Sequence, residues 1–144
     1  MQALTLNGDS YIWTMPAEKI DLYWSQIVNF LNMVDDPDWT NDQVFTAIAS
    51  KQAQVWGVVT DGNINGIWVT KIMENSHKFG VVWIAAGIPT DKIDLSGGID
   101  LFLSSTEPWF KEMGCEYVKI VGRKGWKKAL PEFKEHSVEL RKYL

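Results

Sequence analysis

The segment spanning residues 54–73 constrains the fold of this chain more than any other part of its sequence. Two runs rich in Val, Ile, Trp and Thr, residues 54–60 and 64–73, flank the tripeptide Asp61-Gly62-Asn63. The apolar residues of these runs recur with a period near two, as in strands whose side chains point to opposite faces. The central tripeptide tolerates the positive φ angles that tight hairpin turns require. The segment therefore predicts an antiparallel β-hairpin.

Further strands are predicted on both sides of this hairpin. Residues 79–86 follow a polar loop and are apolar at nearly every position, as is typical of a central strand covered on both faces. Residues 4–6 and 11–14 are short apolar runs that predict a small first hairpin or a single irregular strand. Two later strands are expected at residues 116–121 and 137–140, and residues 122–131 between them are helix-like only in their middle.

Three segments predict helices. Pro16 suits the first turn of a helix, and the apolar residues after it recur at helical spacing over about five turns. Thr40 and Gln43 form a capping-box pattern that predicts the start of a second, shorter helix. Residues 93–113 predict a third helix, and Pro108 inside it is expected to kink that helix or divide it in two.

The order of these elements places the chain in the α+β class. Its 144 residues match the length of about one domain, so we expect a single domain over residues 1–144. The chain contains 8 tryptophans. Four of them lie on apolar stripes or strands and are expected in the core: Trp24, Trp56, Trp83 and Trp109. The environment of three others stays open: Trp13, Trp39 and Trp68.

Charge argues against a general attraction to polyanions. The chain carries 14 Lys and Arg against 18 Asp and Glu, a net charge of -4, whereas binding to nucleic acid or an anionic membrane needs a basic surface. We therefore expect neither nucleic acid nor membrane as a partner. Of the 14 basic residues, 9 follow position 110, which leaves a local basic patch near the C-terminus open.

Cysteine usage and hydropathy favour an intracellular protein. Cys115 is the single cysteine, so an internal disulfide is impossible and no metal site is expected. We expect its thiol to be buried as a small apolar group. The sequence has neither an apolar run of about 18 residues nor a signal-peptide pattern, which predicts a soluble protein that is not secreted and has no transmembrane segment.

The order of elements resembles that of the GNAT acyltransferase fold, a mixed, mainly antiparallel central sheet flanked by helices. In that fold a long antiparallel hairpin leads to a central strand, a crossover helix, a splayed parallel strand, a short helix and a final strand. The resemblance covers nearly the whole chain. It implies that residues 79–86 are the central strand, that residues 93–113 are the crossover helix, and that residues 116–121 form the splayed strand.

Residues 114–144 carry a set of spaced motifs: a Gly-Cys pair, Gly-Arg-x-Gly-Trp, Leu-Pro-x-aromatic and a closing Val-x-Leu-x-Lys-x-Leu. This ending resembles that of a family of small GNAT-like proteins found in bacteriophage genomes. The matching residues here are Gly114, Cys115, Gly122, Arg123, Gly125, Trp126, Leu130, Pro131, Phe133, Val138, Leu140, Lys142 and Leu144. The resemblance implies a phage origin, a location in the host cytoplasm or the virion, and partners among other phage proteins or host proteins. GNAT folds also imply a possible homodimer.

The resemblance implies a site for acyl-CoA only if certain residues fit. GNAT enzymes hold the pyrophosphate of acyl-CoA at the start of the crossover helix, in an Arg/Gln-x-x-Gly-x-Gly/Ala loop, where glycines let the backbone approach the phosphates. That pattern is absent here, and Gly97 and Gly98 stand instead among Asp91, Asp94 and Asp100, whose charges oppose a pyrophosphate. If acyl-CoA binds, Gly97 and Gly98 are the residues expected to hold it.

The catalytic groups of a GNAT enzyme are not matched by a motif. The family commonly uses a Tyr, in a Tyr-x-x-x-Gly-Phe context, to protonate the departing thiolate. When Phe133 is aligned with that Phe, Lys128 stands in place of the Tyr and Glu132 in place of the Gly. The residues that could act as a general base near the strand splay are, by type alone, Glu74, His77 and Glu116.

A basic segment around Trp126 is the remaining candidate binding site. Arg123 and Lys124 precede this tryptophan and Lys127 and Lys128 follow it. Such a cluster predicts a phosphate or carboxylate site, or a basic interface with an aromatic anchor. The alternative is that Trp126 packs into the core while the lysines are solvated.

Three hypotheses for function follow. The first is a phage-encoded GNAT-fold protein that acts in virion assembly or as an accessory binding protein, without acetyl transfer and without a cofactor. The missing pyrophosphate loop and the missing Tyr favour it. The second is a divergent acetyl-CoA-dependent N-acetyltransferase that uses Gly97 and Gly98. The third is a protein that binds a host protein or a small ligand through Arg123, Lys124 and Trp126.

Overall fold

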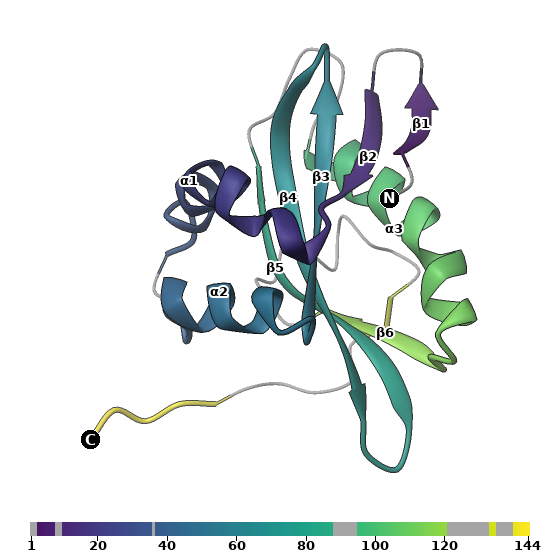
Figure 1. The fold of residues 1–144 in the computed structure, drawn as a ribbon. Coiled ribbons are helices and arrows are strands. Elements are labelled where there is room, and N and C mark those ends of the chain that lie inside the picture. Colours follow the sequence, from purple (N-terminus) through teal and green to yellow (C-terminus); the bar gives the residue numbers. More distant parts are fainter. Residues whose placement is uncertain (1–2, 8–9, 36, 88–94, 121–132, 135–139) are drawn as a thin grey trace.

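A single six-stranded sheet organises the chain in the computed structural model (Figure 1), which describes residues 3–7, 10–35, 37–87, 95–120, 133–134 and 140–144. The strands lie side by side in chain order, and every neighbouring pair is antiparallel except the last, which is parallel. Their bounds are β1 Ala3–Asn7, β2 Ser10–Thr14, β3 Ala53–Thr60, β4 Asn63–Glu74, β5 Lys78–Gly87 and β6 Tyr117–Ile120. The mixed, mainly antiparallel α+β class is therefore confirmed.

Helices cover both faces of this sheet. Helices α1 (Ile20–Leu31) and α2 (Asn41–Ala49) lie on one face, and α3 (Leu95–Glu112) lies on the other (Figure 1). Each face has its own apolar core, because the side chains of a strand alternate between the two faces. The core under α1 and α2 contains Phe30, Ile48, Val69 and Ile84 among others, and the core under α3 contains Trp56, Trp68, Val82 and Phe102.

The hairpin predicted around residues 61–63 is confirmed. Strands β3 and β4 pair in antiparallel register from Ala53 opposite Lys71 to Thr60 opposite Asn63. The turn residues Asp61 and Gly62 have φ angles of 52° and 81°. Positive φ at both central residues gives the turn the twist that matches two right-handed strands, which is why Asp and Gly stand there.

The first two helices begin where the sequence predicts. Pro16 precedes a short 3-10 turn, η1 (Ala17–Lys19), which leads directly into α1. The regular helix is shorter than the five turns predicted, since it ends at Leu31. The capping box of α2 is confirmed: the Gln43 N–H donates to Thr40 Oγ1 at 3.2 Å, and the Thr40 N–H donates to Gln43 Oε1 at 2.9 Å.

Helix α3 corrects the prediction for Pro108. The helix runs without interruption from Leu95 to Glu112 with Pro108 inside it, so the predicted division into two helices is wrong. Proline removes one backbone donor from a helix, but the buried side chains of Phe102 and Phe110 hold the segments on either side of it against the sheet. Burial of two aromatic side chains outweighs the loss of one helical hydrogen bond.

The tryptophans divide between full and partial burial. Trp56 is buried as predicted, and Trp68, whose environment the sequence left open, is buried too. The other tryptophans within the described ranges pack half-buried against one of the two cores: Trp13, Trp24, Trp39, Trp83 and Trp109.

Two predicted elements cannot be compared with the structure. The helix-like segment at residues 122–131 and the last strand predicted at residues 137–140 fall on or beside residues 121–132 and 135–139, which lie outside the described residues. Among the helices that are described, none is long and apolar enough to cross a membrane.

Candidate functional site

Strands β5 and β6 pair along part of their length in the described residues. They pair in parallel from Phe79 opposite Tyr117 to Val82 opposite Ile120. Strand β5 continues beyond this point to Gly87 and stays paired with β4 on its other side, as far as Gly66 opposite Gly87. In the described part of the chain, the β6 side of residues 83–87 therefore has no pairing strand. We call these residues the open edge of β5.

A β-bulge marks the start of the open edge. Thr70 on β4 lies opposite Val82, and the preceding Val69 lies opposite Ile84, so Trp83 is an extra residue without a partner on β4. A bulge leaves backbone groups outside the ladder and changes the direction of a side chain. The open edge thus offers backbone N–H and C=O groups to an extended ligand, as an unpaired strand edge does.

The side chain of Trp83 is covered by a lysine from the neighbouring strand. Nζ of Lys71 lies 3.5 Å from the centroid of the Trp83 ring, in the geometry of a cation–π contact. Burial lowers the pKa of the Lys71 ammonium group. This pair sits on the face of α1 and α2, next to the last described pair of β5 and β6, Val82 and Ile120.

The two glycines predicted to hold acyl-CoA lie at the start of helix α3. Helix α3 begins at Leu95, so Gly97 and Gly98 fall in its first turn. The first N–H groups of a helix have no intrahelical acceptor and carry partial positive charge, which suits the phosphate-binding role predicted for these glycines. Of the three aspartates that surround them, Asp91 and Asp94 lie outside the described residues, and Asp100 belongs to the same helix.

The predicted general-base candidates lie together at one end of the sheet. Nδ1 of His77 and Oε2 of Glu116 are 2.7 Å apart, and their side chains are 62% and 58% exposed. His77 precedes the first residue of β5, Glu116 precedes the first residue of β6, and Glu74 lies opposite Lys78 at the same end. These residues therefore lie at the end where β5 and β6 pair, and a general-base role for any of them stays a prediction.

Other predicted residues have different outcomes. Arg123, Lys124 and Trp126 lie outside the described residues, as do Lys128 and Glu132, so the predicted binding site around Trp126 stays a prediction. Cys115 is half-buried, and burial raises the pKa of its thiol, which disfavours the nucleophilic thiolate at neutral pH. Within the described ranges, no cluster of three His, Cys, Asp or Glu could hold a metal ion.

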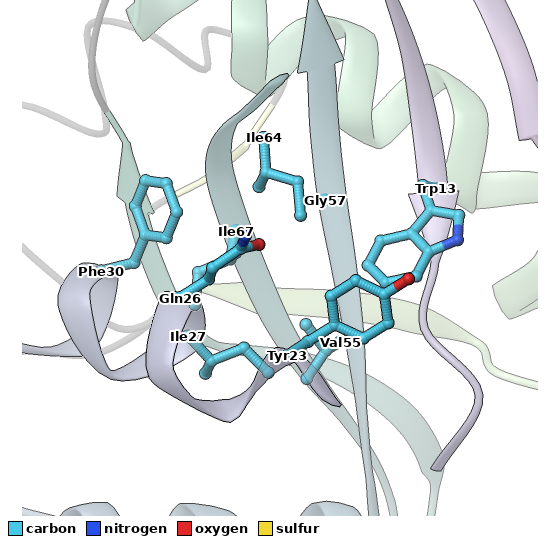
Figure 2. A pocket seen from close by; sticks show the side chains of 9 residues that line it. All are labelled: Trp13, Tyr23, Gln26, Ile27, Phe30, Val55, Gly57, Ile64 and Ile67. Atoms are coloured by element: carbon cyan, nitrogen blue, oxygen red, sulfur yellow. The ribbon is translucent and has the colours of Figure 1, made fainter. Parts of the chain in front are cut away.

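A small apolar pocket lies between α1 and the sheet, over strands β2, β3 and β4. Figure 2 shows Tyr23, Gln26, Ile27 and Phe30 of α1 facing side chains of the strands. The strand residues that line the pocket are Trp13, Val55, Gly57, Ile64 and Ile67. Its cavity volume of about 10 Å³ is room for about one water molecule. Ile67 on β4 is the register partner of Ala86 in the open edge. The pocket therefore reaches the strand next to β5.

Sequence reasoning missed this pocket because its walls come from four separate elements. The clearest contact across it is between Trp13 of β2 and Tyr23 of α1, whose ring centroids are 4.7 Å apart at an interplanar angle of 62°. Trp13 pairs with Gly57 on β3, and the absence of a side chain on Gly57 leaves room for the indole. The Pro16-to-α1 turn that brings Tyr23 over the sheet carries no sequence signal for this contact.

Comparison with solved structures identifies the fold. An aminoglycoside acetyltransferase from an uncultured soil metagenomic sample matches with a TM-score of 0.69 and 13% identity over 97% of this chain and 99% of that one. A GNAT family acetyltransferase of Staphylococcus aureus matches with a TM-score of 0.66 and 8% identity over 95% and 100% of the two chains.

A third structural neighbour was solved with acetyl-CoA bound. A predicted acetyltransferase of Clostridium acetobutylicum, whose crystal structure contains acetyl-CoA, matches with a TM-score of 0.62 and 12% identity over 93% of this chain and 96% of that one. No protein-family model matches the chain, and no curated protein sequence matches it. The chain therefore has the GNAT-like fold that its order of elements resembles, and at these identities the likeness concerns the fold alone.

Proposed function

We propose that this chain is a divergent acyl-CoA-dependent N-acyltransferase whose donor lies along the open edge of β5. The single observation that carries the proposal is that the described pairing of β5 with β6 ends at Val82 and Ile120, immediately before the bulge at Trp83. A fold with enzymes of this class among its neighbours, and a strand edge that is unpaired within the described residues, favour the second sequence hypothesis over the first.

The donor arm of acyl-CoA matches the chemistry of the open edge. This arm is an extended chain with amide groups, and an extended chain can add to an unpaired strand edge by backbone hydrogen bonds. Residues 83–87 supply such an edge. At the far end of the donor, the pyrophosphate would be held by the first turn of α3, where Gly97 and Gly98 allow close approach.

An unsatisfied buried donor beside the open edge further supports the proposal. Trp68 is 8% exposed, and its indole N–H finds no acceptor in the described part of the chain. Trp68 is the register partner of Ala85, so this N–H lies one strand from the proposed donor site. Buried polar groups are nearly always paired in folded proteins, and a bound ligand would supply the missing acceptor.

The apolar pocket has room for about one water molecule, so we propose that an acceptor would lie against its wall and not inside it. None of the nine residues that line it carries a charged side chain, and the surface that they present to the pocket is apolar. Such a wall favours an acceptor whose amine is attached to an apolar group over a polycation, because a polycation needs carboxylates to offset its desolvation. The aminoglycoside specificity of one structural neighbour belongs to that protein.

Calorimetric titration of the whole chain with acetyl-CoA tests the proposal. We expect saturable binding in the micromolar range, abolished in Gly98→Asp because a carboxylate then stands in the first turn of α3. The matched control is Asn29→Asp, which adds the same charge at an exposed position of α1 and should leave binding unchanged. No saturable heat with the native chain would overturn the proposal.

A second candidate keeps the first sequence hypothesis, an accessory binding protein that associates with phage or host proteins. Exposed apolar side chains near the C-terminus favour it: Leu140 is 90% and Tyr143 is 80% exposed. Copurification with the products of neighbouring genes tests it, and loss of a partner in Leu140→Ser/Tyr143→Ser would support it. The phage origin and the binding role of Arg123 and Trp126 stay predictions, and pull-down with Arg123→Glu tests the latter.

A further inference from the structure

Lys71 is held in an unusual way for a lysine on a sheet. Its ammonium group lies on the face of the Trp83 ring, 3.5 Å from the centroid, and in the described part of the chain it makes no ion pair with a carboxylate. Lys51, by contrast, forms a salt bridge of 3.0 Å with Glu18. An aromatic face holds a cation without accepting its proton, so the Lys71 nitrogen keeps its capacity to react once it is deprotonated.

The position of Lys71 in the sheet is as important as its contact. Its register partner on β5 is Val81, whose own partner on β6 is Lys119, one step before the last pair of the two strands. The Trp83 ring then brings the Lys71 amine to the bulge at which the open edge begins. The amine therefore lies where the described pairing of β5 and β6 ends, beside the proposed path of the donor.

The lowered pKa of the Lys71 amine favours its reaction. Burial lowers the pKa of this amine, because a charged group loses hydration in the protein. A lowered pKa increases the fraction of neutral amine at neutral pH, and the neutral amine carries the lone pair that attacks a carbonyl carbon. Lys119 on β6, the register partner of Val81, is exposed, and in the described part of the chain its ammonium group does not lie over an aromatic ring.

We propose that Lys71 is an acylation site of this chain, modified in cis by an acyl-CoA thioester bound along the open edge. The inference rests on the proposed function. The neutral Nζ attacks the thioester carbonyl carbon, the C–N bond forms and the C–S bond breaks. Coenzyme A leaves as a thiolate, which takes up the proton released from the nitrogen. The product is a neutral amide, so the cation–π contact with Trp83 is lost.

The test is acylation of the intact chain, followed by mass spectrometry of the whole protein and of its peptides. After incubation with acetyl-CoA we expect one acetyl group per chain, located at Lys71. In Lys71→Arg, incorporation should fall at least tenfold, because the guanidinium keeps the charge on the ring but is not nucleophilic at this pH. The matched control Lys119→Arg should be labelled at Lys71 at the native rate.

Calorimetry with acetyl-CoA on the same proteins separates the two claims. If the native chain binds acetyl-CoA but Lys71 is labelled no faster than exposed lysines such as Lys111, the inference is overturned while the proposed function stands. If the chain does not bind acetyl-CoA, both are overturned. If Lys71→Arg retains acetyl-CoA binding yet loses the label, the loss is chemical and not a failure to fold, as the inference requires.

Discussion

Trp56 and Trp68 lie directly opposite each other on β3 and β4, are buried to a similar degree, and differ in one hydrogen bond. The Trp56 indole N–H donates to Thr70 Oγ1 at 2.9 Å, and that hydroxyl donates in turn to Gln54 Oε1 at 2.9 Å. The Trp68 indole N–H has no acceptor in the described ranges. The same group thus has an acceptor at one position and none among the described residues at the other.

This difference predicts that the same substitution destabilises the fold by different amounts at the two positions. Trp56→Phe should lose a buried hydrogen bond and lower the free energy of unfolding by about 1 kcal/mol more than Trp68→Phe does, because both changes remove the same volume. Urea denaturation of the two variants without ligand measures the difference. With saturating acetyl-CoA, Trp68→Phe should lose part of the ligand-induced stabilisation. Equal costs in the absence of ligand would contradict the assignment.

Gly80 on β5 packs directly against the aromatic ring of Phe110 on α3, which leaves no room for a side chain. A Cβ at this position would lie 2.4 Å from Cε1 of Phe110, which is far inside van der Waals contact. We expect Gly80→Ala to destabilise the fold by about 1–3 kcal/mol. The double variant Gly80→Ala/Phe110→Leu should cost less than the sum of its single changes, because the smaller side chain relieves the clash. Thermal unfolding of the three variants checks this, and additive costs would argue against the contact.

The capping box of α2 predicts a local loss of stability. Thr40→Ala removes the acceptor of the Gln43 N–H and should lower the free energy of unfolding by about 1 kcal/mol. Thr46→Ala is the matched control, because Thr46 is an exposed residue inside the same helix. Chemical denaturation should leave this control within about 0.5 kcal/mol of the native chain. Equal losses in both variants would show that the cap does not act.

Glu18 predicts a measurable titration. Its pKa is lowered first by a backbone hydrogen bond and then by hydrogen bonding and attraction to Lys51. A lowered pKa in the folded state means that the interaction contributes above the unfolded pKa and is lost as pH falls through the folded pKa. In Lys51→Met the pKa should rise but stay below its ordinary value, because the backbone contribution remains. NMR titration of the Glu18 carboxyl carbon measures this pKa. An unchanged value in Lys51→Met would contradict a contribution from Lys51.

Local patterns predicted much of the fold because they act within a few residues. Backbone preference alone accounts for the turn at Asp61-Gly62, and local hydrogen bonds account for the cap at Thr40. The period of the side chains accounts for strands β3 to β5. The continuity of α3 through Pro108 could not be predicted, since it depends on how Phe102 and Phe110 pack against a distant sheet.

The candidate site was predicted less well, because it depends on the register of strands that are distant in the sequence. His77 and Glu116 precede the first residues of β5 and β6, and only the pairing of these two strands shows that the two side chains meet. The contact between Lys71 and Trp83 depends on a one-residue bulge, which no residue type in the strand announces. Gly97 and Gly98 were placed correctly at the start of the helix after β5.

The most direct test of the central claim is hydrogen exchange of the backbone amides with and without acetyl-CoA. If the donor lies along the open edge, amides within residues 83–87 and in the first turn of α3 should exchange at least tenfold more slowly with the ligand bound. Amides of β3, which is paired on both sides, should change little. Unchanged exchange at residues 83–87 under saturating acetyl-CoA would contradict the account.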